Sequence, residues 1–414
     1  MIIDFTVENF LSIKDAATLS LVASPPYNIH PSHIIDSPDE NIKLLKMVVL
    51  YGANASGKSN FLIALKALRS FILTSHTNEP DEHLKLMPFI LDKGTKEEPT
   101  SFDINFFADN IRYNYSLTLV KEEIYNEELY YFPKGKKTKV FTRDLLENDE
   151  YEYSFGSLLK PKRIYEDIAF KTSNNILFIS KAVQDNSKPL KVVYDWFSKI
   201  LTEEPGINEV AEEIRESEDK KENLIRFLSN QDLDIFDISV DVRLVAEELR
   251  QDPNVNISAE LRARILEDLK DKKFLKITTY HRDNDGDLVP LPLGYESEGT
   301  RKLFSLSPIF EENEISKVFF IDEISSDLHP LLVKNYVTSA QEQSNNQLIC
   351  VTHDTHLIDP DIMRKDQIYF VEKGLNQATR IYSLLDFKAR NDRENWELRY
   401  LSGRYGATPS LTNI

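Results

Sequence analysis

A glycine-framed loop follows an apolar run near the start of the chain. Residues 48–60 read VVLYGANASGKSN, in which Gly52 to Ser59 have the form G-x-x-x-x-G-K-S. Glycines at this spacing let the backbone curl so that several N–H groups point at phosphate oxygens. We expect Lys58 to contact the β- and γ-phosphates of a nucleotide and the Ser59 hydroxyl to bind Mg²⁺. The expected phosphate-binding residues are Gly52, Asn54, Ala55, Ser56, Gly57, Lys58, Ser59 and Asn60.

Two acidic residues end a later apolar run, KVFFIDE at 317–323. Alone this is a weak signal, because many strands end in acids. Together with the loop it indicates ATP hydrolysis, which needs a carboxylate beside the metal and a group that orients the attacking water. We expect Asp322, with Ser59, to hold Mg²⁺ and Glu323 to polarise the water. The expected cofactors are therefore ATP and Mg²⁺.

A third apolar run, ICVTHDTH at 349–356, ends in Thr352 and His353. A histidine at the carboxyl edge of a parallel sheet lies where ligands bind. We expect His353 to contact the γ-phosphate or the attacking water, so that Glu323 and His353 are the two catalytic residues. The nearby His356 is expected to be structural or exposed.

A second anion-binding element is expected at residues 295–304, YESEGTRKLF. Ser297 and Gly299 place a hydroxyl and free backbone N–H groups at the start of a helix. One chain rarely needs two cradles for one phosphate group. A physical solution is that Ser297 and Gly299 close on a nucleotide bound by a second copy of the chain.

The elements that position these residues follow from apolar periodicity. Residues 47–51 are expected to form a buried strand and residues 58–74 a helix, which gives the strand–loop–helix order that a phosphate loop requires. Alternating residues within 1–22 and 100–132 predict antiparallel strands. The runs that end in the acids and in His353 are continuously apolar, as expected for parallel strands covered on both faces.

The middle of the chain is expected to be largely helical between residues 190 and 270. The segments EVAEEIRESEDKKENLIRFL and AELRARILEDLKD have amphipathic spacing, and DIFDISVDVRL between them is a candidate strand. The many acids of these helices are at the spacing of a solvated face. The expected segments are 1–132 and 273–385 for the two parts of the nucleotide-binding core, 133–272 for an insertion and 386–414 for a helical tail.

The motifs stand in the order found in ABC-type ATPase heads. Gly52–Ser59, Glu296–Gly299, Ile321–Glu323, SSDLHP at 325–330 and VTHD at 351–354 resemble Walker A, signature, Walker B, D-loop and H-loop. The 237 residues between Ser59 and Ser297 resemble the split of SMC and RecF-type heads. The resemblance implies an α/β fold, a mixed sheet with a P-loop core plus an antiparallel β subdomain, with a mainly helical insertion. It also implies that Asp327 contributes to nucleotide binding.

The chain is also similar to bacterial AAA-type ATP-binding proteins of the abortive-infection AbiL and RloA group. The similarity lies in NFLSIKD, YGANASGKSN, SEGTRKLF, IDEISSDLHP and the tail YLSGRYGATP. It implies a homodimer of heads around two ATP molecules, in a sensor ATPase of phage defence that acts with a small companion effector protein. The alternative is a DNA-repair or recombination head of SMC or RecF type that binds DNA directly.

Three positions depart from the ABC pattern. The first glutamine is Gln184, so the usual Q-loop ligand is missing from the early strands. Glu298 replaces a signature glycine, where an acid is unfavourable near phosphates unless it faces away or is paired. His329 replaces the usual acid of the D-loop.

Composition excludes several other classes of protein. The 414 residues suffice for two or three domains, and the single cysteine, Cys350, excludes a disulfide framework or a cysteine-based zinc site. Neither a membrane span nor a signal peptide is expected, so the interpretation is a cytoplasmic protein. The net charge of −18 argues against a broad nucleic-acid-binding surface, although a local DNA contact stays open. The basic run PKGKKTK at 133–139 is expected to be a solvated hairpin turn. Less favoured functions are nuclease or toxin activity in 130–270 and energising transport.

Overall fold

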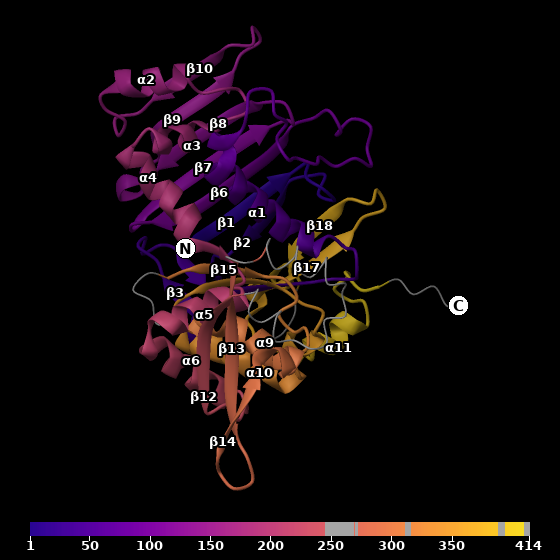
Figure 1. Ribbon diagram of the computed structural model, residues 1–414. Coiled ribbons are helices and arrows are strands. Elements are labelled where there is room, and N and C mark those ends of the chain that lie inside the picture. The colour runs from indigo at the N-terminus through magenta and orange to yellow at the C-terminus, as the bar shows by residue number, and fades with distance from the viewer. Residues whose placement is uncertain (245–268, 270–271, 311–315, 388–393, 410–414) are drawn as a thin grey trace, which may run out of the picture. The chain divides into compact units, whose positions relative to one another are not determined.

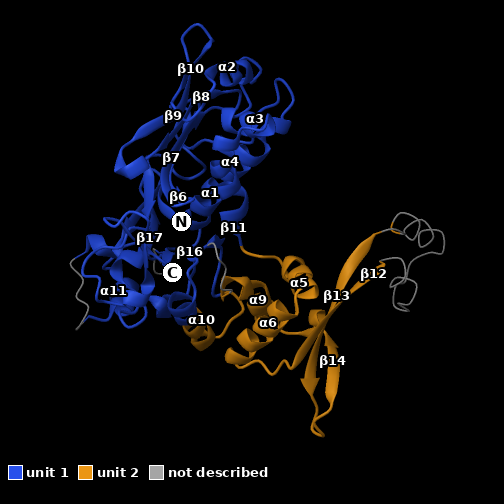
Figure 2. Ribbon diagram, turned by 90° about the vertical axis from the view of Figure 1, so that its left-hand side faces the viewer, with its two compact units in different colours: residues 1–203, 312–325, 337–414 blue, residues 204–311, 326–336 orange. Residues whose placement is uncertain are grey.

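The structure is a computed structural model, and it describes residues 1–244, 269, 272–310, 316–387 and 394–409. The chain forms two compact units, which Figure 2 colours separately. The first unit comprises residues 1–203, 312–325 and 337–414, and the second comprises residues 204–311 and 326–336. The predicted helix AELRARILEDLKD lies, but for one residue, outside the described residues.

The first unit contains a six-stranded sheet that carries the phosphate loop. Its strand order is β11-β15-β16-β5-β17-β18, and the neighbouring strands are parallel except for β18, which is antiparallel to β17. Both faces of the central strands are covered, so their residues are continuously apolar, as the sequence indicated. The strands are β5 Met47–Tyr51, β11 Leu201–Glu203, β15 Val318–Ile321, β16 Gln347–Val351, β17 Ile368–Lys373 and β18 Thr379–Ser383.

The second sheet of this unit is antiparallel and seven-stranded, in the order β10-β9-β8-β7-β6-β1-β2. Asp109 and Asn110, both with positive φ, form the turn from β6 to β7. The two sheets confirm the expected α/β fold class. The strands are β1 Ile2–Glu8, β2 Ala17–Ser20, β6 Thr100–Ala108, β7 Ile111–Leu119, β8 Ile124–Tyr131, β9 Thr138–Leu145 and β10 Tyr151–Phe155.

The antiparallel sheet is longer than the sequence indicated, because it continues through β9 and β10. The segment boundary expected at residue 132 therefore falls inside this sheet, in the connection from β8 to β9. Consecutive residues Val140 to Arg143 of β9 are all buried, which removes the alternation that marks a strand in the sequence. The basic run 133–139 forms this connection and the start of β9, and most of its lysines are exposed.

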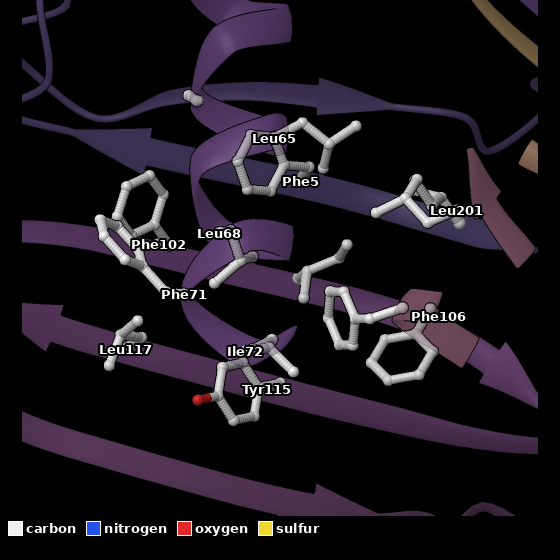
Figure 3. Packing of buried hydrophobic residues seen from close by; sticks show 14 of the residues in the cluster. Phe5, Leu65, Leu68, Phe71, Ile72, Phe102, Phe106, Tyr115, Leu117 and Leu201 are labelled. Atoms are coloured by element: carbon white, nitrogen blue, oxygen red, sulfur yellow. The ribbon is translucent and has the colours of Figure 1, made fainter. Parts of the chain in front are cut away.

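Helix α1, Lys58–Thr74, packs against the antiparallel sheet and joins both sheets in one core (Figures 1 and 3). Its bounds match the predicted helix. The ring of Phe61 meets that of Phe5 of β1 edge-on, with centroids 5.4 Å apart. Leu65, Leu68 and Ile72 are also buried in this core. Packing at both ends of α1 thus fixes the position of the phosphate loop that precedes it.

Three helices cover the outer part of the antiparallel sheet, and a buried carboxylate of the sheet ties one of them to it. Glu127 of β8 accepts hydrogen bonds from the N–H groups of Phe178 and Ile179, at the start of α3, and lies 3.8 Å from Arg143 of β9. The helices are α2 Lys162–Phe170, α3 Phe178–Gln184 and α4 Lys188–Asp195, and α4 continues into a π-helical turn at Trp196–Ile200.

The second unit combines a three-stranded antiparallel sheet with helices, and it contains the predicted strand within DIFDISVDVRL. In its core the rings of Phe227 and Phe310 stack, and the ring of Tyr336 meets that of Phe310 edge-on. Its elements are α5 Ile207–Glu216, α6 Glu218–Asn230, β12 Asp237–Leu244, β13 Lys273–Arg282, β14 Leu288–Pro292, α9 Glu298–Leu306 and the first turns of α10 Pro330–Gln343. Among the described residues, no helix combines the length and apolarity needed to cross a membrane.

Candidate nucleotide-binding site

The phosphate loop joins β5 to α1, and close contacts explain both of its glycines. A Cβ on Gly52 would lie 2.1 Å from the carbonyl oxygen of Val371 in β17. Gly57 has φ +104°, and a Cβ there would lie 2.1 Å from Oγ1 of Thr379. Thr379 Oγ1 donates to the carbonyl of Ser56 at 2.8 Å. The loop therefore packs tightly against β17 and β18, and any side chain at either glycine would displace it.

The Lys58 side chain lies over the loop. It is 5% exposed, and its ammonium donates to the carbonyl oxygens of Gly52 at 2.9 Å and Ala53 at 3.1 Å. Burial lowers the pKa of Lys58, while the carboxylates of Glu323 and Asp322 act in the opposite direction. The two predicted acids therefore contribute to the electrostatic environment of this lysine.

The predicted metal-binding and catalytic side chains lie together at the carboxyl edge of the same sheet. The Ser59 hydroxyl donates to Oδ1 of Asp322 at 3.2 Å. Glu323, the next residue, has φ +54°, so the chain turns sharply after β15. Oε1 of Glu323 lies 3.1 Å from Nε2 of His353. Strands β5, β15 and β16 are neighbours, so their loops bring residues far apart in sequence to one place.

Hydrogen bonds hold the β15 and β16 loops together. Ile324 N–H donates to the Val351 carbonyl at 3.1 Å, and the Ser325 hydroxyl lies 2.6 Å from Oγ1 of Thr352. Thr352 is completely buried. The relative positions of Glu323 and His353 are thus set by the loops that carry them as well as by their own contact. His356 is exposed and pairs with Asp354 at 2.7 Å.

A cavity of about 450 Å³ opens where these groups meet. It is lined by Asn54 to Asn60, Glu323, His353 and Lys373. The Ser56 hydroxyl is buried and has no hydrogen-bond partner among the described residues, and a phosphate oxygen would supply one. These residues fit a nucleotide phosphate chain. They also fit Mg²⁺ beside Ser59 and Asp322, because Mg²⁺ commonly takes one or two protein oxygens and completes its shell with phosphates and water.

Two residues of the site were missed by the sequence analysis. Lys373 ends β17, and a cation at the carboxyl end of a strand beside β5 is the signal that would have indicated it. Ser12 accepts from Nδ2 of Asn60 at 2.6 Å and lies 2.7 Å from Oγ1 of Thr379. The Asn60 side chain is therefore used to anchor the loop. Ser12 lies in the segment NFLSIKD but has no spacing pattern that marks it.

The signature and D-loop residues belong to the second unit. Ser297 caps α9, and its Oγ accepts from the Thr300 N–H at 3.0 Å. A Cβ on Gly299 would lie 2.6 Å from the Asp327 carbonyl oxygen, so only glycine permits this close approach. The structure therefore brings Ser297, Gly299 and Asp327 together within one unit.

The two unusual residues of these motifs both have local partners. Glu298 forms an ion pair with Arg301 one turn along α9, which meets the requirement that an acid near a phosphate site be paired. His329 precedes α10, and its Nδ1 accepts from the Leu331 N–H at 3.2 Å. His329 therefore acts as an N-terminal cap of α10, a function that an acid also performs.

Comparison with known families decides the identity of the chain. A family model described as "AAA domain, putative AbiEii toxin, Type IV TA system" matches residues 47–359, from β5 to just beyond His353. The chain belongs to this AAA family. It is accordingly an ATP-binding protein of the AAA-type ATPases. No curated protein matches the chain at a significant level.

Several solved structures are similar to this AAA-family chain over most of its length. They include the SMC head bound to the C-winged helix domain of ScpA, at 14% identity and TM-score 0.41, covering 92% of this chain and 97% of that one. The SMC head domain from Thermotoga maritima has 13% identity and TM-score 0.39, with 92% and 98% coverage. An SMC head with an extended coiled coil, bound to the C-terminal domain of ScpA derived from Pyrococcus furiosus, has 13% identity and TM-score 0.42, with 92% and 96% coverage.

Proposed function

We propose that this AAA-family protein hydrolyses ATP in a Mg²⁺-dependent reaction at the cavity between the phosphate loop and the β15 and β16 loops. The observation that carries the proposal is the convergence of Lys58, Ser59, Asp322, Glu323 and His353 on one edge of one sheet. These five side chains supply a cation for phosphate, an oxygen pair for a metal and a base beside a histidine, which is the set that phosphoanhydride hydrolysis requires.

Each residue has a separate task in this proposal. The loop amides and Lys58 bind the phosphate chain, and Ser59 and Asp322 hold Mg²⁺, which neutralises phosphate charge when bound. The Glu323 carboxylate accepts a hydrogen bond from the attacking water and orients it. His353 holds Glu323 in position through its 3.1 Å contact and lies where it can also contact the terminal phosphate. Lys373 adds positive charge at the mouth of the cavity.

The proposal extends to a homodimer in which each site receives Ser297, Gly299 and Asp327 from the second copy. Support comes from the start of α9, where backbone N–H groups precede the first helical hydrogen bonds and can bind an anion. The Glu298–Arg301 pair offsets the acid that would otherwise repel a phosphate there. Dimerisation would then couple ATP binding in one copy to contacts made by the other.

At the level of the cell, we propose a cytoplasmic sensor ATPase of bacterial phage defence that controls a companion effector protein. The family description, which refers to a toxin of a type IV toxin–antitoxin system, supports this context. The net charge of −18 favours a protein partner over direct binding of nucleic acid. The similarity to the AbiL and RloA group supports the same function.

The experiment that tests this function is an ATPase assay of the purified chain with and without Mg²⁺ and with and without the protein encoded by its operon neighbour. We expect turnover that is abolished by EDTA, restored by Mg²⁺ and changed when the neighbour co-purifies. Absence of Mg²⁺-dependent turnover in both preparations would contradict the proposed activity. Salt-dependent binding of the isolated chain to duplex DNA would favour the repair-type alternative instead.

A further inference from the structure

The C-terminal tail of the chain is bonded directly to the phosphate loop. After β18 the chain reaches helix α11, Trp396–Leu401, and then the turn SGRYGATP at residues 402–409. The carbonyl oxygen of Ala407 in this turn accepts a hydrogen bond from the N–H of Ala53, at 2.9 Å. Ala53 is the second residue of the phosphate loop, so the tail contacts the loop backbone itself.

Two side chains hold Ala407 at this place. Oε2 of Glu372 in β17 accepts the Ala407 N–H at 3.0 Å, and the Tyr400 hydroxyl donates to the Ala407 carbonyl at 3.2 Å. The preceding Gly406 has φ +70°, and a Cβ there would lie 2.5 Å from the Tyr382 hydroxyl and 2.8 Å from Oε2 of Glu372. Even one added methyl group would therefore displace the acceptor of the Ala407 N–H.

Aromatic packing fixes the rest of the tail to the edge of the sheet. The ring of Phe370 in β17 stacks with those of Tyr400 and Tyr405, with centroid distances of 5.2 Å and 5.7 Å. The Tyr382 hydroxyl of β18 donates to the Tyr405 carbonyl at 2.9 Å. Because β17 is the neighbour of β5, the tail is anchored beside the strand that leads into the loop.

These contacts restrain the backbone of Ala53, near the start of the phosphate loop, through both its N–H and its carbonyl oxygen. The N–H of Ala53 is bonded to the tail, and its carbonyl oxygen accepts from Lys58. A loop that is ordered before the ligand arrives loses less conformational entropy on binding. We propose that the tail, residues 396–409, is a positioning element that holds the phosphate loop in its nucleotide-binding conformation. This inference rests on the proposed ATPase function, because it assigns a task to the tail at that same site.

A pair of substitutions at Glu372 tests the proposal. In Glu372→Ala the Ala407 N–H loses its acceptor, and we expect ATP to bind about tenfold more weakly, as KM rises by the same factor. The kcat at saturating ATP should stay within about twofold, because Glu323 and His353 are untouched. Glu372→Gln keeps an oxygen that can accept this hydrogen bond, so its affinity should return to within about threefold of wild type. Thermal melting of the nucleotide-free variants shows whether a loss of ATP affinity comes from a loss of stability of the fold.

A matched pair of glycines provides the control. Gly406→Ala and Gly286→Ala both place alanine at positive φ, but nothing lies within 4 Å of a Cβ at Gly286, in the β13–β14 turn. We expect Gly406→Ala to weaken ATP binding and Gly286→Ala to bind as wild type does. Wild-type protein that binds no ATP would overturn the proposed function and this inference with it. Wild-type binding together with unchanged affinity in Glu372→Ala and Gly406→Ala would overturn this inference alone, as would an equal fall of affinity in Glu372→Ala and Glu372→Gln.

Discussion

Nε2 of His353 lies 3.1 Å from Oε1 of Glu323, and the two residues come from the loops that follow neighbouring parallel strands. The contact places an imidazole where it restrains the carboxylate proposed to orient the attacking water. Glu323 is also the residue at which the chain turns with φ +54°, so both backbone and side-chain contacts determine the position of its carboxylate. We therefore expect the proposed hydrolysis to depend on both residues of this pair.

The substitution Glu323→Gln is expected to separate ATP binding from hydrolysis. The amide keeps the size of the side chain but accepts a proton far less readily, so turnover should fall by at least about tenfold. ATP affinity should stay close to that of wild type, since the loop and Lys58 are unchanged. The variant should also accumulate as an ATP-bound dimer in size-exclusion chromatography with light scattering. Turnover equal to that of wild type would remove Glu323 from its proposed role.

His353→Ala and His356→Ala form a matched comparison for the same step. Both histidines follow β16 and both pair with a carboxylate, but only His353 lines the cavity. We expect His353→Ala to slow hydrolysis by at least about tenfold and His356→Ala to leave it within about twofold. Steady-state phosphate release measures both. Equal effects in the two variants would show that the contact between His353 and Glu323 does not determine the rate of hydrolysis.

Loss of the buried ammonium in Lys58→Ala should abolish ATP binding. The cavity would lose the single lysine of the loop sequence Gly52–Ser59. The negative charge of the phosphates would then lack the ammonium group that pairs with it. Titration with a fluorescent ATP analogue should show no saturation in the range that saturates wild type. Lys66→Ala is the control on the same helix, because Lys66 is partly exposed and pairs with Glu203. Normal affinity in Lys58→Ala would refute the phosphate-loop assignment.

Ser297→Arg tests whether the second anion-binding element acts on another copy of the chain. The bulky cation should block turnover while each chain still binds ATP through its own loop. Mixing this variant with Lys58→Ala should restore part of the activity, because a mixed dimer contains one site with both an intact loop and an intact Ser297. Ser217→Arg is the control, since Ser217 caps α6 in the same unit as Ser297 caps α9. A mixture that regains no activity would argue against sites shared between subunits.

Buried His33 should make the protein less stable in mild acid. Burial lowers the pKa of His33 from 6.5 to about 4, although its Nδ1–H donates a hydrogen bond to Oε1 of Gln367 at 2.9 Å, which acts in the opposite direction. Between these values the unfolded chain binds more protons than the folded one, so the stabilising contribution is present above pH 6.5 and is lost as pH falls towards 4. By pH 5 the loss should be roughly 2 kcal/mol.

Urea unfolding at pH 7.5 and pH 5 measures this effect directly. His33→Gln carries no titrating group at this position, so its free energy of unfolding should fall by less between the two pH values. The comparison of the two pH differences removes the effect of the other titrating groups of the protein. Identical pH differences for wild type and variant would show that His33 keeps an ordinary pKa in the folded protein.

The sequence by itself determined the parts of the molecule that local rules control. The glycine spacing, the apolar strands and the periodicity of 58–74 predicted the phosphate loop, the parallel strands and the bounds of α1, because each depends on residues adjacent along the chain. The order of the motifs also predicted that Ser59, Asp322 and Glu323 would meet at one sheet edge. Parallel strands bring their carboxyl ends together, so this meeting follows from the strand assignment alone.

Only the tertiary structure decided which distant residues support that site. The contact of Ala407 with Ala53, the anchoring of Asn60 by Ser12 and the position of Lys373 join segments from opposite ends of the chain. Nothing in their own sequence spacing marks them, because they depend on which strands become neighbours. The same reason explains β9, in which four consecutive buried residues hide the alternation that marks a strand in the sequence. Packing between distant segments thus adds residues to the site that the local sequence does not indicate.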